Sequence, residues 1–203
     1  MIRRLISPFF AFGLLTAASL SAAPLPTPPP SPSPPIASVS SEQGYEQRTI
    51  EQEAAAFFGE ASEGLAKALA ETFKNQGKPN AYIKGQEFGL AITFGVRYGD
   101  GVMNVYGHDE GQRLFWQGPS IGIDQGLSCS KVFILVYNLP NAETIFRGFP
   151  GVETGLYYYA GISATYLESG NIVLVPIRLG MGLRTGINIG YLRFSRSPSW
   201  NPF

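Results

Sequence analysis

From Ala81 onward the sequence follows a two-residue period, clearest where bulky and small residues alternate over residues 87–101, and this period constrains the fold more than any other feature. In the stretch EFGLAITFGVRYGDG, bulky side chains occupy every second position. Successive side chains of a β-strand point to opposite faces, so this strand has one bulky face and one nearly bare face. The bulky positions are Leu90, Ile92, Phe94, Val96 and Tyr98. A bare face lets a neighbour approach closely, so the stretch predicts a tightly curved strand.

The segments that follow keep the strand pattern. Turns are expected at Gly99–Gly101, Gly107–Gly111 and Ser169–Asn171, because glycine and asparagine adopt the backbone angles that tight turns require. Lys131–Pro140 is apolar on both faces and is predicted to be the most buried strand. The strand glycines are the usual means of bending a sheet sharply. We therefore predict a strongly coiled antiparallel sheet or a small closed β-barrel.

Two amphipathic helices are predicted before the sheet. In the first, Thr49 and Gln52 match a capping box that precedes residues with helical apolar spacing. Ser62 is the expected N-cap of the second helix, and Gly77 and Pro79 end it. Both helices have one apolar face and are expected to pack on the sheet. The predicted fold class is therefore α+β, mainly β.

The N-terminus has the layout of a secretory signal peptide. Arg3 and Arg4 precede an apolar run, which small residues follow. The run is shorter than the roughly 20 residues that a membrane-spanning helix needs. We expect export by this signal to place the protein in the periplasm, and a signal that stays uncleaved would anchor it to the inner membrane. We divide the chain into a signal peptide at 1–23, a proline-rich disordered linker at 24–45 and a single β-barrel-like domain at 46–203.

The linker contains the tract PLPTPPPSPSPP, Pro24 to Pro35. Such a tract favours an extended polyproline II helix of about 3.1 Å per residue, so it can reach roughly 35–40 Å. It serves either as a solvated spacer or as a segment that docks in an aromatic groove of a partner.

Composition and residue counts exclude several functional classes. Lys plus Arg and Asp plus Glu are equal at 15 each, whereas a nucleic-acid-binding protein shows a basic excess. The single Cys129 and the single His108 cannot make a zinc site, and we expect no metal and no cofactor. We interpret Cys129 as a small buried residue beside the core rather than as a nucleophile. The glycines of Gly118–Lys131 fit no phosphate-binding loop, because no helix follows them, and are expected to bend the sheet.

Carboxylates in the predicted strands leave a hydrolase open as an alternative. Glycoside hydrolases use two carboxyl groups whose separation decides the stereochemical outcome. The candidates are Glu87, Asp124, Glu153 and Glu168.

Basic and aromatic side chains in the predicted strands form the candidate ligand-binding site. Arg178 and Arg184 lie an even number of residues apart and therefore share one face of a strand. One interpretation is that the arginines neutralise the strand carboxylates. The other is that they line a cleft for an anionic envelope molecule such as a lipid headgroup. The full set is Arg97, Trp116, Lys131, Arg147, Tyr166, Arg178 and Arg184.

Several blocks of the sequence resemble a known family. GKPNAYIKGQE, FWQGPSIGID, SKVFILVYNLP and VPIRLGMGLRTGINIGYL occur in the order found in the alphaproteobacterial family that includes envelope integrity protein A. The resemblance covers nearly all of Gln47 to Phe203. It implies a secreted periplasmic protein with a β-barrel-like domain and N-terminal helices, required for envelope integrity, and it implies no catalytic residues. More distantly, the glycine-rich β segment resembles the SYLF domain, which implies binding of anionic lipids.

These observations lead us to expect a non-enzymatic periplasmic protein that maintains the cell envelope and its resistance to stress. We expect it to bind an envelope lipid, glycan or protein partner, with transient membrane association and no nucleic acid. Two alternatives stay open. One is a peptidoglycan or glycan hydrolase that uses the strand carboxylates, and the other is an adaptor that acts through the proline-rich arm.

Overall fold

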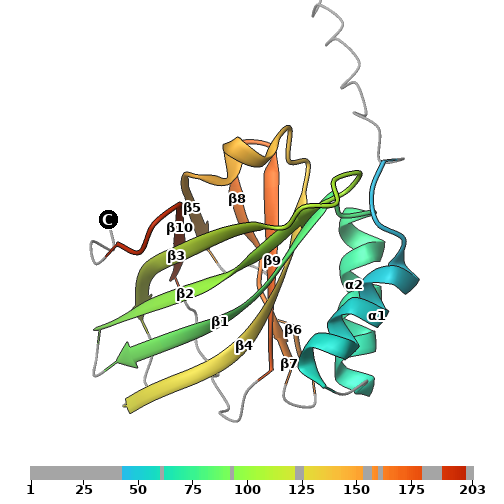
Figure 1. Cartoon of the computed structure of the whole chain (residues 1–203). Coiled ribbons are helices and arrows are strands. Elements are labelled where there is room, and N and C mark those ends of the chain that lie inside the picture. The colour runs from blue at the N-terminus through green and yellow to red at the C-terminus, as the bar shows by residue number, and fades with distance from the viewer. Residues whose placement is uncertain are drawn as a thin grey trace, which may run out of the picture. The chain divides into compact units, whose positions relative to one another are not determined.

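In the residues that it describes, the computed structural model of the chain has two α-helices, a short 3-10 helix and a curled antiparallel sheet (Figure 1). The structure describes residues 43–59, 62–91, 94–121, 126–152, 157–159, 162–179 and 189–199. These residues belong to one compact unit, Ser38–Phe203. Within this described part, none of the helices is both long and apolar enough to cross a membrane.

The first helix, α1 (Gln47–Phe58), begins earlier than its sequence suggests. The capping box predicted at Thr49 is wrong, because Thr49 lies inside the first turn and Glu46 is the N-cap, without a side-chain hydrogen bond. The Glu46 carboxylate instead forms an exposed ion pair with Lys78 at 2.6 Å. Residues at i, i+4 and i+8 form the buried face. They are Ile50, Ala54 and Phe58.

The second helix, α2 (Glu63–Gln76), has the caps that the sequence predicts. The Ser62 hydroxyl accepts a hydrogen bond from the backbone N–H of Leu65 at 3.2 Å. Gly77 ends the helix with a φ of 77°, in the left-handed region that favours glycine. The buried face includes Leu65, Ala68 and Leu69.

Ten strands of the described residues form one sheet, and every strand pair among them is antiparallel. Its order is β5-β10-β3-β2-β1-β4-β9-β7-β6, and β8 pairs with β9 beside this path. A short 3-10 helix, η1 (Ala142–Ile145), connects β4 to β5. The strands are β1 (Ala81–Ala91), β2 (Phe94–Val105), β3 (Gln112–Ile121), β4 (Gly126–Tyr137), β5 (Gly148–Val152), β6 (Tyr157–Tyr159), β7 (Ile162–Ala164), β8 (Leu167–Ser169), β9 (Ile172–Leu179) and β10 (Ile189–Ser195).

The two ends of the sheet approach each other. β5 at one end contacts β8, which pairs with β9 near the other end. Figure 1 shows the resulting curl, with α1 and α2 against its outer surface. The prediction of a strongly coiled, mainly β fold with two packed helices is therefore confirmed.

The hydrophobic core has two layers, one on each face of the sheet. The inner layer fills the curl and includes Ile83, Leu114, Trp116 and Phe194. The outer layer lies between the helices and the sheet and includes Leu69, Phe133, Leu135 and Val175. Strand β4 contributes to both layers, and its side chains from Val132 to Tyr137 are at most 1% exposed. This confirms the most buried strand predicted from sequence.

The alternation over residues 87–101 predicts one strand, but the structure folds this stretch into a hairpin. β1 ends at Ala91 and β2 begins at Phe94. The turn predicted at Gly99–Gly101 is also wrong, because these glycines lie within β2. Both arms of a hairpin keep the same two-residue period, so alternation alone does not show where a chain reverses. The turns predicted at Gly107–Gly111 and Ser169–Asn171 are confirmed.

Cys129 lies on the outer face of β4 and is exposed, so its interpretation as a buried residue is wrong. It pairs in register with Phe88 of β1, which is also exposed. The next residues of β4 are buried only from Val132 onward. Composition shows that β4 is apolar, but it does not show how far along the strand the buried part extends.

Candidate functional site

A buried carboxylate joins four strands inside the curl. Arg178 of β9 donates to Glu87 of β1 from Nε to Oε1 at 3.1 Å and from Nη2 to Oε2 at 3.3 Å. Arg97 of β2 places Nη1 3.9 Å from the same Oε1. Trp116 of β3 donates from Nε1 to Oε2 at 3.1 Å. Arg178 also reaches the hydroxyl of Thr165 at 3.4 Å, so each group of the cluster has a polar neighbour.

The electrostatics of this cluster keep Glu87 ionised. Burial by itself would raise the pKa of Glu87, but the charges of Arg178 and Arg97 outweigh it, together with hydrogen bonds from Arg178 and Trp116. The result is a pKa of about 2. A general acid or base works best with a pKa near the operating pH, so this carboxylate suits a fixed charge better than proton transfer. Arg97 and Arg178 thus follow the first of the two interpretations, in which strand arginines neutralise a carboxylate.

Trp116 explains the bare face of the neighbouring strands. A Cβ added to Gly99 would lie 2.1 Å from the indole, and one added to Gly85 would lie 2.6 Å from it. Only glycine leaves room for the ring at these positions. The indole therefore packs directly against the backbone of β1 and β2, where it is 1% exposed. At Gly99 the close neighbour on the small-residue face is therefore Trp116.

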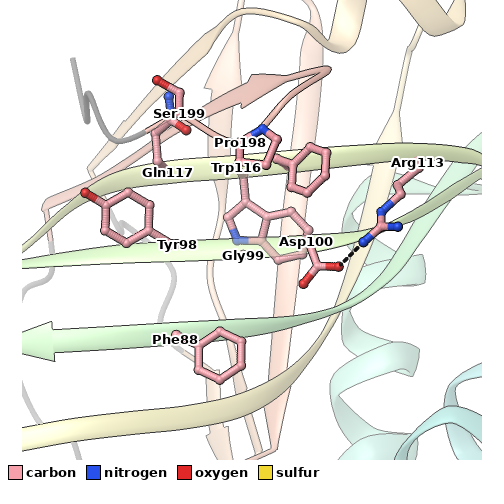
Figure 2. Close-up of a pocket in the computed structure, with 10 residues that line it drawn as sticks. Phe88, Tyr98, Gly99, Asp100, Arg113, Trp116, Gln117, Pro198 and Ser199 are labelled. Atoms are coloured by element: carbon pink, nitrogen blue, oxygen red, sulfur yellow. Dashed lines mark hydrogen bonds and ion pairs between the residues drawn. The ribbon is translucent and has the colours of Figure 1, made fainter.

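A pocket of about 440 Å³ opens among β1, β2, β3 and the segment after β10 (Figure 2). We call it the outer-face pocket, because most of its side chains point to the outer face of the sheet, the face on which α1 and α2 pack. Aromatic rings form much of its wall, and a few polar groups lie among them, which is typical of ligand sites. The lining residues are Phe88, Tyr98, Gly99, Asp100, Arg113, Phe115, Trp116, Gln117, Pro198 and Ser199.

Strand register builds the outer-face pocket. Phe88 pairs with Tyr98, and Asp100 pairs with Phe115, so the side chains of each pair point to the same face. Phe88 is 45% exposed, and exposed apolar side chains that gather in one patch often mark a binding site. Nη2 of Arg113 lies 3.4 Å from Oδ2 of Asp100, and Figure 2 shows this pair at the side of the pocket. Both groups are well exposed, so the pair is weak and can rearrange to meet a ligand.

The structure brings three of the predicted site residues together and separates the others. Arg97, Trp116 and Arg178 meet at Glu87. Lys131 is exposed on the outer face of β4, where its ammonium donates to the backbone carbonyl of Phe57 in α1 at 3.0 Å.

The remaining predicted residues lie elsewhere. Arg147 is exposed before β5, with its guanidinium 5.8 Å from the centre of the Phe149 ring. Tyr166 is half-buried and packs against the outer core layer. Arg184 lies outside the described residues.

Sequence reasoning misses the aromatic wall of the pocket, formed by Phe88, Tyr98 and Phe115. Tyr98 belongs to the bulky face of the predicted strand, so a signal exists. However, a bulky face is expected of a buried core as well as of a binding site. Exposure separates the two cases, and exposure depends on which part of the sheet the helices cover.

The family model described as envelope integrity protein A matches residues 43–203. The chain belongs to this family. Envelope integrity protein A is named for a role in the integrity of the cell envelope, and the match spans all the described elements. The prediction of the family is therefore confirmed.

A solved structure supports the fold of the envelope integrity protein A family. It is a crystal structure described as a β-barrel-like, uncharacterised protein from Brucella abortus, with a TM-score of 0.70 and 39% sequence identity. The alignment covers 79% of this chain and 99% of the Brucella chain. No curated protein matches the chain.

Proposed function

We propose that this member of the envelope integrity protein A family is a non-enzymatic protein that acts by binding an envelope molecule in the outer-face pocket. The ligand classes are an envelope lipid, a glycan and a partner protein. The pocket itself carries the proposal, because it offers Phe88, Tyr98 and Phe115 as apolar walls next to the Arg113–Asp100 pair. The predicted arginines support it less, since Arg97 and Arg178 already neutralise Glu87.

The carboxylates favour binding over hydrolysis. Glu87 is buried and holds its charge against two arginines. Glu168 is exposed on β8, and Asp124 and Glu153 lie outside the described residues. Asp100 is the one carboxylate among the residues that line the pocket, whereas glycoside hydrolysis by the usual route needs two. A hydrolase therefore gains no support from the pocket.

We further propose that the protein works in the periplasm. Residues 1–23 would direct export, 24–45 would form the linker and 46–203 would be the working domain. An uncleaved signal would keep the same domain on the periplasmic side of the inner membrane. The envelope role of the family supports this location.

Native mass spectrometry of the chain, purified gently from an envelope extract, tests the proposal. We expect a stoichiometric adduct that Phe88→Ala removes. Val102→Ala is the matched control, because Val102 is 40% exposed on the outer face of β2 but does not line the pocket. Phe88→Ala is also expected to weaken resistance to envelope stress, and Val102→Ala is not. Equal behaviour of the two variants would contradict the proposal.

A further inference from the structure

A proline of the chain itself already forms part of the outer-face pocket. Pro198 and Ser199, from the segment after β10, line the pocket together with Trp116 and Gln117 of β3 (Figure 2). Pro198 remains exposed, so it supplies a wall without filling the space. The site therefore accommodates a pyrrolidine ring in an aromatic setting.

The tripeptide at this wall occurs twice in the chain. Ser197-Pro198-Ser199 matches Ser31-Pro32-Ser33, which lies within the tract Pro24–Pro35. Eight of the twelve residues of this tract are proline, and none is charged. Segments of this kind adopt the polyproline II helix before they bind, so they lose little conformational entropy in an aromatic groove.

The chemistry of the pocket fits such a segment. Phe88 and Tyr98 are cross-strand partners, and partners on one face of a sheet have Cβ atoms about 4.5–5.5 Å apart. Their side chains therefore form adjoining walls against which proline rings can pack. Proline carbonyls accept hydrogen bonds but the ring nitrogen donates none, so the segment needs donors on the protein. The guanidinium of Arg113 provides donors at the rim, and its pairing with Asp100 keeps the rim close to neutral.

We propose that the outer-face pocket of one copy binds the tract Pro24–Pro35 of a second copy of the chain. The inference rests on the proposed function, because it names the occupant of the same pocket. Residues 36–42 separate the tract from Gln43, the first described residue. These seven residues span up to about 25 Å when extended, which lets the tract reach a neighbouring molecule.

This contact joins two different surfaces, the tract of one copy and the pocket of the next. Such heterologous contacts produce rings when the rotation closes and open chains when it does not. Each added copy presents a new free pocket or a new free tract. The association is therefore expected to extend beyond dimers as the protein concentration rises.

Calorimetric titration of the domain, residues 43–203, with the synthetic peptide PLPTPPPSPSPP tests the contact. The Brucella chain is covered to 99% by an alignment with 79% of this chain, so we expect the domain to fold on its own. We expect saturable binding that Phe88→Ala weakens about tenfold, as the loss of an aromatic anchor does, while Val102→Ala leaves it unchanged. A peptide with alanine in place of every proline should not bind. Equal binding to the two variants, or no saturation at millimolar peptide, would overturn the proposal.

Sedimentation of the chain 24–203 tests whether the occupant is a second copy. Its mass is expected to rise with concentration and to return to that of a monomer when free peptide is added. The domain 43–203 and the Phe88→Ala variant of 24–203 should remain monomeric. A chain 24–203 that stays monomeric at every concentration would overturn the second copy as the occupant.

The two proposals can fail separately. If the peptide does not bind but native mass spectrometry shows a lipid or glycan adduct that depends on Phe88, the proline tract is not the occupant and the proposed function stands. If Phe88→Ala and Val102→Ala retain the same adduct and the same stress resistance, the proposed function fails.

Discussion

Trp116 and Glu87 form one buried unit at the scale of single residues. The indole fills the space left open by Gly85 and Gly99, and its Nε1–H holds one oxygen of the Glu87 carboxylate. A buried ion pair often adds little net stability, because desolvation offsets the attraction, but removing one partner is costly. Loss of the Glu87 carboxylate is therefore expected to be costly, because it would leave buried positive charge without its counterion.

Replacing the carboxylate tests this view. Glu87→Gln removes the charge that faces Arg97 and Arg178, and it is expected to lower the free energy of unfolding by about 3–5 kcal/mol. Urea denaturation of the domain 43–203 measures the loss. Glu168→Gln changes an exposed carboxylate on β8 and should have an effect within about 0.5 kcal/mol. Similar losses in both variants would show that Glu87 has no special structural role.

The space under the indole gives a second prediction. Gly99→Ala puts a methyl group where Trp116 lies and is expected to cost about 1–3 kcal/mol of unfolding free energy through overpacking. In a Trp116→Leu background the same substitution should cost much less, because the clash is gone. A double-mutant cycle measured by urea denaturation gives the coupling between the two sites. Additive effects would mean that the glycine is needed for another reason.

At the scale of elements, features set by neighbouring residues can be predicted from the sequence, whereas the pairing of distant strands cannot. The caps at Ser62 and Gly77 depend on a few neighbouring residues, and both are found. The reversal between β1 and β2 is missed, because the side-chain period is unchanged across it. Pro176 lies in β9 opposite the gap between β7 and β8, where the sheet needs no donor. No local pattern predicts that gap.

The two helix starts provide a matched test at this scale. Ser62→Ala removes a side-chain cap from α2 and should lower the free energy of unfolding by about 1 kcal/mol. Thr49→Ala replaces an exposed residue inside α1 with a better helix former, so it should be neutral or stabilising by a few tenths of a kcal/mol. Thermal unfolding of the two variants measures the difference. If Thr49→Ala lowered the stability as much as Ser62→Ala, the result would support a capping role for Thr49.

At the scale of the whole molecule, the helices decide which outer residues become a site. Tyr82 and Phe133 lie on the outer face under the helices and are buried, whereas Phe88, further along β1 on the same face, is exposed. Alternation places all of these residues on one side of the sheet but does not show where the helices end. The pocket also needs Pro198 from beyond the last strand. The fold could thus be predicted from the sequence, while the pocket depends on contacts between segments far apart in the chain.

Acid should destabilise the domain through the buried carboxylate of Glu87. The pKa of Glu87 is about 2 in the folded protein and near its ordinary value of 4.5 when unfolded. Between these values the unfolded chain binds more protons, so the stabilisation is complete above about 4.5 and is lost as the pH falls through about 2. The difference corresponds to on the order of 3 kcal/mol.

Urea denaturation at a series of pH values from neutral to strongly acidic measures this dependence. The gap in stability between the wild type and Glu87→Gln is expected to be largest at neutral pH and to narrow below about 4.5, since the wild-type carboxyl then takes up a proton on unfolding. Glu168→Gln should retain the wild-type profile, because that carboxylate is exposed on β8. The stability gap between the wild type and Glu87→Gln could instead stay constant across this pH range. In that case Glu87 would act by packing alone, and the charge of the buried cluster would have no part in holding the four strands together.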